Sequence, residues 1–435
     1  MKYRVPLRDI ENYIDKDVYT SGFVDRIREL KKMQFIVLED RTGKGQITNE
    51  KRNNDLQRTI SELTVGSVVG VYGVVRKNDH VKLRGLEIIP HELEIYSLAE
   101  SPLPIDNESP LSTRLDWRHL DLRDPKKRLI FEIQTTVEQA MREYWLSEDF
   151  IEIHSPKLVE GATESGAELF KLDYFGKEAS LAQSPQFYKQ MAMSAGFEKV
   201  FEIGPVFRAN PSFTSRHDTE FTSVDVEMSW IESHEDVMEF EERWLQHVLG
   251  VVECKHGKEI KDYFGSDVKV PKIPFPRLTI NEAYKVLEKM GYKVPRDEKG
   301  DLDPKGEKLL SEYAQKNFDH EFIFVTDYPA KARPFYHMRY ADRPDITKSF
   351  DLIWKGLEVT TGAQREHRYD VLYKQALEKG IDIDTISHYL NFFRYGCPPH
   401  GGFGFGLSRM LMILLDLPNV REVTYIYRGP NRLTP

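Results

Sequence analysis

The chain contains little cysteine and no long hydrophobic run. Only Cys254 and Cys397 occur among its 435 residues, too few for a disulfide framework or a cysteine-rich metal site. The longest apolar run, residues 410–415, is far too short to cross a bilayer. The first residues contain no apolar core of the kind found in secretion signals. These features predict a cytoplasmic protein in a reducing compartment, with no membrane partner.

The chain also lacks the excess of basic residues that is typical of many nucleic-acid-binding proteins. It has 61 Lys and Arg against 70 Asp and Glu, a net charge of −9. Local basic patches can nevertheless bind RNA on an acidic protein, so the global charge excludes nothing. The length fits two or three domains, and neither repeats nor low-complexity segments are present.

Residues 1–100 have the pattern of a small all-β domain. Strand-like runs with intervening turns cover residues 18–24, 34–38, 46–47, 68–75 and 81–89. About five short strands suit a closed barrel, of which the oligonucleotide-binding (OB) barrel is a common form. Arg26 and Arg28 then lie beside Phe35, and a basic patch next to an aromatic suits single-stranded nucleic acid. A solvated hairpin with one core phenylalanine is the alternative.

The rest of the chain predicts a linker and a larger domain. Residues 101–125 contain several prolines and are expected to form a linker or hinge. From residue 126 to residue 435 helical and strand patterns are mixed, beginning with a helix over residues 128–146. Residues from about 240 to 345 have the pattern of an insertion made of helix and loop.

A glycine-rich run near the end of the chain predicts an anion site. Residues 401–406 contain four glycines, and the apolar helix that follows carries Arg409 in its first turn. A helix N-terminus favours anions, and an unpaired buried guanidinium is costly. A phosphate bound beside Arg409 would resolve both problems. A structural ion pair between Arg409 and a distant carboxylate is the alternative.

The strand predicted at residues 220–228 carries a polar face. Period-2 alternation puts four of its side chains together on that face: Phe221, Ser223, Asp225 and Glu227. Arg208 precedes the adjoining loop, and Arg216 and His217 lie within it. The combination favours a binding face, with a solvated face as the alternative.

A hairpin predicted over residues 351–359 brings two acids together. Lys355 and Gly356 suit a two-residue turn, which makes Asp351 and Glu358 diagonal neighbours on one face, about 7–8 Å apart between Cα atoms. Two carboxylates at that distance repel each other unless a cation lies between them. Oxygen ligands of this kind suit Mg²⁺, with phosphate supplying others. A surface hairpin with two solvated acids is the alternative.

Together these segments resemble the class II aminoacyl-tRNA synthetases, most closely the aspartyl-tRNA synthetases of archaeal and eukaryotic type. Residues 150–156, 207–221 and 404–409 are similar to the family's three motifs in order, and residues 183–190 resemble its QSPQxxKQ segment. The resemblance implies an N-terminal all-β OB-fold barrel, for anticodon binding, and an α+β catalytic domain whose antiparallel sheet is flanked by helices.

The resemblance also implies the reaction and the partners. It implies ATP-dependent activation of L-aspartate to aspartyl-adenylate and transfer to tRNA(Asp) by a Mg²⁺-dependent homodimer. Whether tRNA(Asn) is charged as well stays open. Three other functions also stay open: an asparaginyl-tRNA synthetase, a synthetase-derived asparagine synthetase that makes the free amino acid, and a catalytically inactive tRNA-binding paralogue.

By the same resemblance, individual residues receive roles. Arg208 and Arg409 would be catalytic and hold the α- and γ-phosphates of ATP. The ATP-binding set would be Arg208, Arg216, His217, Phe221, Glu358 and Arg409. The aspartate-binding set would be Glu164, Ser184, Gln186, Lys189, Asp225 and Arg365, with Lys189 opposite the substrate β-carboxylate. The anticodon-binding set would be Arg26, Arg28, Phe35 and Gln46. The metal ligands would be Asp351 and Glu358.

Several positions depart from the family's pattern. Asn210 stands where an acid is usual, and Ser165 replaces a glycine in the loop expected to close over the substrate. Phe23 replaces a frequent tryptophan in the barrel, and residues 31–33 replace a glycine-containing turn. Arg365 has the wrong strand parity relative to Glu358, so the hairpin requires a β-bulge, which we expect near Gly362.

Overall fold

The computed structural model describes residues 3–52, 54–161, 168–211, 214–295 and 300–435. The chain divides into two compact units, Met1–Pro125 and Lys126–Pro435. Among the described residues, no helix is both long enough and apolar enough to cross a membrane.

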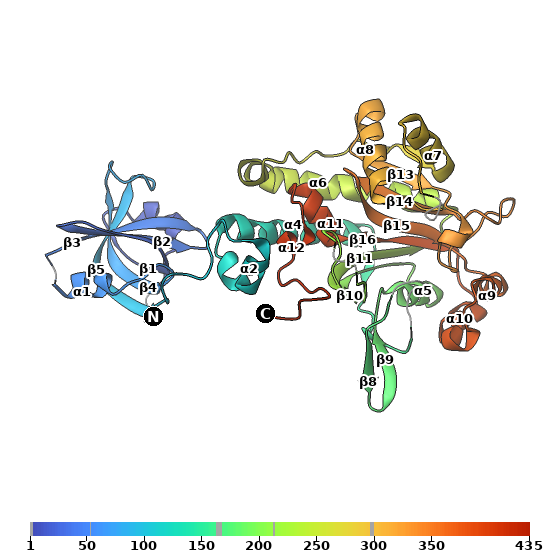
Figure 1. Cartoon of the computed structure of the whole chain (residues 1–435), viewed down its shortest axis with the longest axis horizontal. Helices are drawn as coiled ribbons and strands as arrows, with labels where there is room; N and C mark the ends of the chain where they lie inside the picture. Colours follow the sequence, from blue (N-terminus) through green and yellow to red (C-terminus); the bar gives the residue numbers. More distant parts are fainter. Residues whose placement is uncertain (1–2, 53, 162–167, 212–213, 296–299) are drawn as a thin grey trace. The chain divides into compact units, whose positions relative to one another are not determined.

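Unit 1 is built on a closed five-stranded barrel with the order β1-β2-β3-β5-β4 (Figure 1). Its strands are β1 (Asp17–Glu29), β2 (Met33–Asp40), β3 (Gly43–Glu50), β4 (Val68–Lys77) and β5 (Leu86–Ser97). The short helix α1 (Asn54–Ser61) connects β3 to β4, and the 3-10 helix η1 (Leu7–Tyr13) precedes β1. The predicted all-β OB-type fold is confirmed, although the last strand begins at Leu86 rather than at residue 81.

Alternation along the strands separates a core from an outer face. In β2, Ile36 and Leu38 are fully buried inside the barrel, whereas Phe35 and Val37 are only partly buried. A period-2 pattern predicts this alternation for a sheet that has one face in the core and the other face in water. The segment predicted to be a linker contains two short helices, α2 (Leu111–Asp116) and α3 (Arg118–Asp121).

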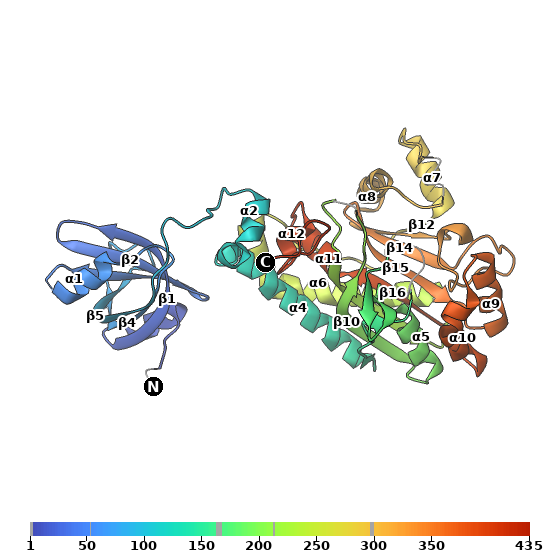
Figure 2. The ribbon, with the colours of Figure 1, turned by 60° about the horizontal axis from the view of Figure 1, so that its bottom comes forward.

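Unit 2 is organised around an eight-stranded sheet with the order β12-β13-β14-β15-β16-β11-β10-β6 (Figure 2). Its strands are β6 (Ile151–Glu152), β10 (Lys199–Phe207), β11 (Glu220–Ser229), β12 (Arg277–Thr279), β13 (Phe322–Thr326), β14 (Ser349–Trp354), β15 (Leu357–Arg365) and β16 (His400–Gly406). Neighbouring strands run antiparallel except at the two edges, where β6 pairs with β10 and β12 with β13 in parallel. The predicted antiparallel, helix-flanked sheet is confirmed.

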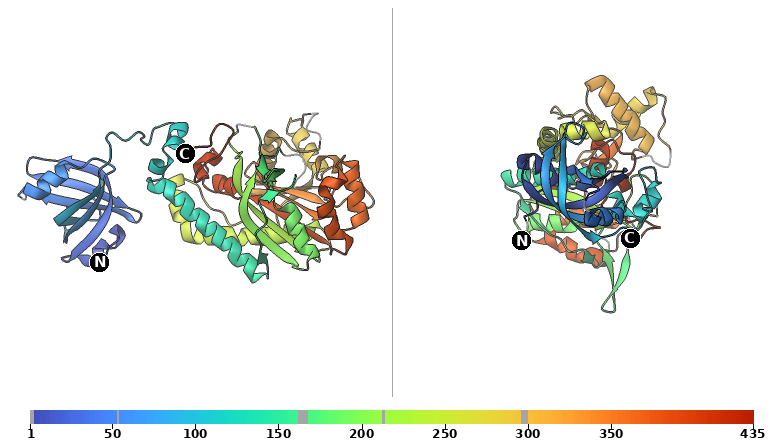
Figure 3. Two further views of the ribbon diagram at one scale, coloured as in Figure 1. Left: turned by 90° about the horizontal axis from the view of Figure 1, so that it is seen from below. Right: turned by 90° about the vertical axis from the view of Figure 1, so that its left-hand side faces the viewer.

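Two long helices cover one face of this sheet. Figure 3 shows α4 (Pro125–Ser147) and α6 (His234–Phe264) lying together against it. Trp145 of α4 stacks on Trp244 of α6 with 5.2 Å between ring centroids, and Trp244 also contacts Phe403 of β16. All three aromatic side chains are fully buried, so they join both helices and the central strand in one core.

The remaining elements surround the sheet. They are β7 (Leu158–Val159), β8 (Lys171–Tyr174) and β9 (Lys177–Leu181), which form a small separate sheet, and α5 (Gln186–Ser194), α7 (Ile280–Lys289), α8 (Pro304–Phe318), η3 (Ala330–Ala332), α9 (Tyr369–Glu378), η4 (Ile383–Ile386), α10 (Ser387–Arg394), α11 (Leu407–Leu414) and α12 (Val420–Val423). Residues 240–345, expected to form an insertion, contain most of α6 and add β12 and β13 to the main sheet; α7 and α8 have a core of their own.

Close packing explains one glycine of the run at residues 401–406. Gly402 lies directly opposite Glu227 in the ladder between β16 and β11. A Cβ atom at residue 402 would lie 2.0 Å from the Val226 carbonyl oxygen and 2.4 Å from a Glu227 carboxylate oxygen. At this position the glycine therefore lets the neighbouring strand, rather than a ligand, approach closely.

Substituting this glycine tests the packing. We expect Gly402→Ala to destabilise unit 2 by roughly 3 kcal/mol or more, because the clash involves backbone that cannot rotate away. Gly404→Ala is the matched control, since its Cβ would lie 3.3 Å from the nearest atom, a side-chain oxygen of Asp225. Thermal unfolding of both variants measures the difference. Equal unfolding temperatures for the two would contradict this explanation.

Candidate active site

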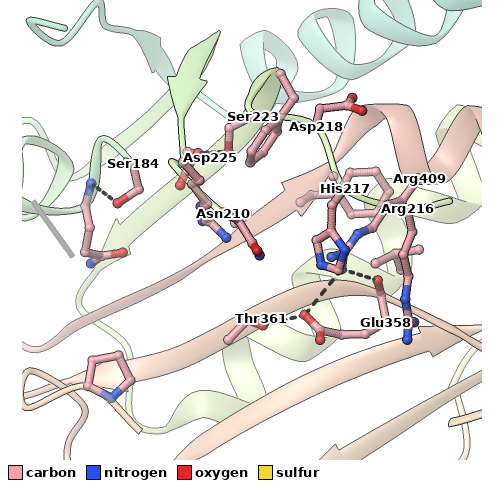
Figure 4. Close-up of a pocket in the computed structure, with 18 of the residues that line it drawn as sticks. Ser184, Asn210, Arg216, His217, Asp218, Ser223, Asp225, Glu358, Thr361 and Arg409 are labelled. Carbon is pink, nitrogen blue, oxygen red and sulfur yellow. Dashed lines mark hydrogen bonds and ion pairs between the residues drawn. The ribbon is translucent and has the colours of Figure 1, made fainter. Parts of the chain in front are cut away.

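A cavity of about 610 Å³ opens in unit 2 along β11, β15 and β16 (Figure 4). Most residues that the sequence predicted for ATP or amino-acid binding line it: Ser184, Gln186, Arg208, Arg216, His217, Phe221, Asp225, Glu358, Arg365 and Arg409. Lys189 and Asp351 lie close to the cavity without lining it. Glu164 and the rest of the predicted closing loop from residue 163 to residue 166 lie outside the described residues.

One end of the cavity is rich in arginine. Arg409, in the first turn of α11, donates from Nη1 to the Glu358 carbonyl oxygen at 2.8 Å, while the Glu358 carboxylate is 3.8 Å away. The guanidinium of Arg208 lies over the Phe221 ring, 5.4 Å from its centroid. Burial and the charges of Arg409, Arg216 and Arg208 lower the pKa of His217. An anion entering this end would therefore meet several cations.

Arg216 is held by a carboxylate from another segment. Its Nη1 atom lies 3.0 Å from Glu307 of α8, and the same Glu307 carboxylate accepts a hydrogen bond from the Glu358 backbone N–H. Glu307 is buried, which raises its pKa despite the nearby charge of Arg216. This pair joins the loop between β10 and β11 to α8 (Figure 4 shows Arg216 beside His217 and Glu358).

The predicted β-bulge is present in the β14–β15 hairpin, but at a different position. The pairs Trp354–Leu357 and Ile353–Glu358 match the predicted register, and the next pair is Leu352–Thr360. The extra residue is therefore Val359. Gly362, where we expected the bulge, is regularly paired; a Cβ there would lie 2.2 Å from the Phe350 ring.

The bulge puts three oxygen-bearing side chains on the cavity side of the hairpin. Thr361 pairs with Asp351 across the ladder, and its hydroxyl donates to the Glu358 carboxylate at 2.9 Å. Asp351 is buried and accepts a hydrogen bond from Arg333 through one oxygen, while its Oδ1 atom has no hydrogen-bond partner. Burial, opposed by Arg333, raises the pKa of Asp351 to about 7.

This donor set fits Mg²⁺. Asp351 and Glu358 supply hard carboxylate oxygens, and the unpartnered buried Oδ1 of Asp351 needs a cation or a donor. In the described residues, this hairpin included, no three His, Cys, Asp or Glu side chains come close enough to hold a metal by themselves. A Mg²⁺ ion at this hairpin would therefore take its remaining ligands from phosphate and water.

The other end of the cavity is built on a buried charge cluster. Glu227, fully buried on β11, accepts from Arg365 Nε at 3.1 Å and lies 3.3 Å from Lys189 Nζ. Lys189 also donates to Asp225 at 3.0 Å and to the Phe403 carbonyl oxygen at 3.0 Å. We refer to Lys189, Asp225, Glu227 and Arg365 as the four-charge cluster. Two cations and two carboxylates balance within it.

The charge balance keeps Glu227 ionised. Burial alone would raise its pKa, but Arg365 and Lys189 outweigh burial, and the pKa of Glu227 is lowered. Arg365 is further fixed by donating to the Gly402 carbonyl oxygen at 2.9 Å and to His337 Nε2 at 3.0 Å. Both Asp225 and Arg365 line the cavity, so the cluster presents one carboxylate and one guanidinium to a ligand.

Several cavity residues were not predicted from the sequence, among them Arg333 and His337. Arg333, which binds Asp351, and His337, which accepts from Arg365, lie on the irregular segment after η3. Neither belongs to a strand or helix with a recognisable period, and both fall inside the segment that we expected to be an insertion. Their partners come from β14 and β15, so only the tertiary structure identifies them.

The residues predicted for the anticodon share one face of the barrel. Arg28 of β1 pairs with Phe35 of β2, and Arg26 pairs with Val37, which in turn pairs with Gln46 of β3. All of these side chains are exposed or partly buried, so they form a continuous outer surface. Phe23 is one of the positions that depart from the family's pattern. The guanidinium of Arg123 lies over its ring, 4.2 Å from the ring centroid.

Removing the central carboxylate tests the four-charge cluster. We expect Glu227→Gln to lower the free energy of unfolding at neutral pH by about 3–5 kcal/mol, because buried Arg365 loses the carboxylate that it binds and buried Lys189 loses one of the two carboxylates beside it. Folding lowers the pKa of Glu227 below its ordinary value of 4.5. The difference in unfolding free energy between the variant and the wild type should therefore be complete above pH 4.5, and it should shrink as the pH falls through the lower pKa of the folded state.

Glu152→Gln is the control for this experiment. Glu152 lies 3.2 Å from Arg142 and is 29% exposed, so its loss should change stability by less than about 1 kcal/mol. Urea unfolding monitored by tryptophan fluorescence, repeated between pH 3 and pH 8, measures both variants. A Glu227→Gln effect as small as that of Glu152→Gln would contradict the proposed charge balance.

Comparisons with known proteins agree with the geometry. A family model described as "tRNA synthetases class II (D, K and N)" matches residues 110–427, and one described as "OB-fold nucleic acid binding domain" matches residues 18–96. The aspartate--tRNA(Asp) ligase of Pyrococcus abyssi is 45% identical over 426 residues, 97% of this chain and 96% of that protein. The aspartate--tRNA(Asp/Asn) ligase of Aeropyrum pernix is 43% identical over 435 residues, 98% and 97% of the two chains.

Solved structures give the same picture. Asparaginyl-tRNA synthetase from Pyrococcus horikoshii, complexed with asparaginyl-adenylate, has a TM-score of 0.92 at 32% identity and full coverage of both chains. Aspartyl-tRNA synthetase from Entamoeba histolytica has a TM-score of 0.89 at 30% identity, covering 100% of this chain and 93% of that one. The higher identity to aspartate ligases does not favour the asparaginyl alternative. The chain therefore belongs to the class II tRNA synthetases and, within them, to the aspartate--tRNA ligases.

Proposed function

We propose that this chain is an ATP-dependent ligase that activates L-aspartate to aspartyl-adenylate and transfers it to tRNA(Asp). The observation that carries the proposal is the division of one cavity into two ends of different chemistry. Arg208 and Arg409 lie at an end that suits a triphosphate, and Arg365 lies at an end that suits a carboxylate. The relatives named aspartate--tRNA ligases, which match almost the whole chain, support the same reaction.

The first step would be attack of the aspartate α-carboxylate on the α-phosphorus of ATP, with departure of pyrophosphate. Arg208 would bind the α-phosphate and neutralise the charge that develops there, while Arg409 would hold the γ-phosphate. Phe221 would stack on the adenine, and Arg216 and His217 would contact the triphosphate. No side-chain nucleophile is required, because positioning of the two substrates supplies much of the rate.

Asp351 and Glu358 would hold Mg²⁺, which when bound neutralises phosphate charge. Their own contribution is to keep two carboxylate oxygens facing the phosphates from a hairpin fixed by its bulge. In the second step the terminal adenosine hydroxyl of the tRNA would attack the adenylate carbonyl and release AMP. Arg208 would remain on the leaving phosphate throughout.

The four-charge cluster would recognise the amino acid. Arg365 would bind the β-carboxylate, with Lys189 contributing its charge and exchanging one of its present hydrogen bonds for the substrate. Asp225, Ser184 and Gln186 would orient the α-amino group. Because the substrate ammonium group would share Asp225, three positive groups would face the two carboxylates of the cluster. The neutral amide of asparagine would not supply the third negative charge, which costs roughly 2–5 kcal/mol in a desolvated site.

A homodimer is part of the proposal. Apolar side chains are exposed in and next to residues 150–156, the segment similar to the family's first motif: Leu146, Ile151 and Leu158 are 61%, 47% and 50% exposed. They lie around Pro156 and the short edge strand β6, whose outer edge is open among the described residues. A second copy packing there would remove this apolar surface from water.

Pyrophosphate exchange tests the amino-acid assignment. We expect L-aspartate to support ATP–pyrophosphate exchange with a kcat/KM roughly a hundredfold or more above that for L-asparagine. Lys189→Ala should abolish the exchange at ordinary aspartate concentrations, whereas Lys171→Ala, on the exposed β8, should leave it intact. Thermal unfolding of both variants checks that they fold. Exchange that prefers asparagine, or a folded Lys189→Ala variant with wild-type exchange, would overturn the assignment.

The range of tRNA substrates is a separate proposal. We propose that the barrel also accepts the anticodon of tRNA(Asn), because Phe23 and residues 31–33 depart from the family's pattern where discrimination is expected. The relative named for both tRNAs supports this reading. Charging of purified tRNA(Asn) with labelled aspartate should proceed at a rate of the same order as charging of tRNA(Asp). Charging of tRNA(Asp) alone would contradict it.

A further inference from the structure

We propose that Gln190, His400 and Tyr389 are positioning residues that fix the amide of Gln186 so that its oxygen faces the cavity and accepts a hydrogen bond from the substrate's ammonium group. The inference deepens the proposed function, since it concerns the amino-acid end of the same cavity. Gln190, His400 and Tyr389 are fully buried, and none of them lines the cavity. They would therefore act on the substrate only through Gln186.

The orientation begins at a backbone carbonyl. His400 Nδ1 lies 2.8 Å from the carbonyl oxygen of Pro398, which can only accept a hydrogen bond. The hydrogen of a neutral His400 ring must therefore be on Nδ1, which leaves Nε2 with a lone pair. Burial lowers the pKa of His400 to about 4, so the ring is neutral near pH 7.

The lone pair on His400 decides the orientation of Gln190. Nε2 of Gln190 lies 3.1 Å from Nε2 of His400 and must be the donor of this hydrogen bond. The Gln190 oxygen then points to the other side, where it accepts from the Tyr389 hydroxyl at 3.0 Å and from Gln186 Nε2 at 2.9 Å. A tyrosine hydroxyl and an amide nitrogen both supply hydrogens, so every contact of Gln190 is matched.

Gln186 is the end of this chain of hydrogen bonds. Its side chain is 5% exposed and lines the cavity together with Ser184 and Asp225. Because its amide nitrogen donates to Gln190, its oxygen is left as the acceptor, and no described residue donates to that oxygen. An ammonium group beside Asp225 would supply the missing donor.

Without these neighbours the two orientations of the Gln186 amide would differ little in shape. The reversed orientation would direct an N–H donor at the substrate's ammonium, which has no lone pair to accept it. Fixing the amide through Gln190 removes the reversed orientation before the substrate arrives. Preorganisation of this kind increases affinity without adding a contact.

Aspartate and succinate form a suitable pair of probes, because succinate lacks only the ammonium group. We expect Gln190→Leu to raise the dissociation constant for aspartate about tenfold or more while changing that for succinate less than twofold. Isothermal titration calorimetry measures all of these affinities on the full-length chain.

Two further variants keep the test decisive. Tyr389→Phe removes one donor to Gln190 with little change in packing, and we expect a smaller loss of aspartate affinity, again without a loss for succinate. Ser194→Ala is the control, because Ser194 ends α5, the helix that carries Gln186 and Gln190. It should change the affinity for neither aspartate nor succinate. Equal losses for aspartate and succinate, or unchanged aspartate binding in Gln190→Leu and Tyr389→Phe, would overturn the proposal. If the wild type bound no aspartate, the proposed function itself would fail.

Discussion

The burial of Glu227 is the constraint on which the rest of the catalytic unit depends. A carboxylate that is fully buried must be paired, and Arg365 and Lys189 provide the two positive charges. Those cations come from β15 and α5, so neutralising one strand residue fixes three elements relative to one another. Gly402 belongs to the same arrangement, because only a residue without Cβ lets β16 pass beside the Glu227 carboxylate. The glycine-rich run thus supports the proposed amino-acid end of the cavity as well as the proposed phosphate end.

The two ends of the cavity are connected through β15. Its bulge at Val359 lets Glu358, Thr361 and Arg365 face the same side, although a regular strand would separate Glu358 from the other two. Glu358 contacts Arg409 at the phosphate end, and Arg365 is held by Glu227 at the amino-acid end. One irregularity in one strand therefore brings Glu358, a proposed metal ligand, and Arg365, the proposed carboxylate-binding residue, to one cavity.

Much of this arrangement could be predicted from the sequence, for identifiable reasons. Period-2 patterns gave the barrel, and the turn at Lys355 and Gly356 gave the hairpin register, because both depend on local geometry. The need for a bulge followed from strand parity. Its position at Val359 depends on the packing of the sheet, so strand parity could not predict it. The contacts of Lys189 with Asp225 and with the Phe403 carbonyl join residues far apart in the chain, so no local pattern reveals them.

The central claim is that a preformed, charge-balanced cluster reads the substrate's side-chain carboxylate. A crystal structure of the protein with a non-hydrolysable aspartyl-adenylate analogue tests it most directly. We expect the β-carboxylate within hydrogen-bonding distance of Arg365 and Lys189, with Glu227 still bound to both cations. A β-carboxylate located away from Arg365, or an analogue phosphate occupying that end of the cavity, would contradict the account.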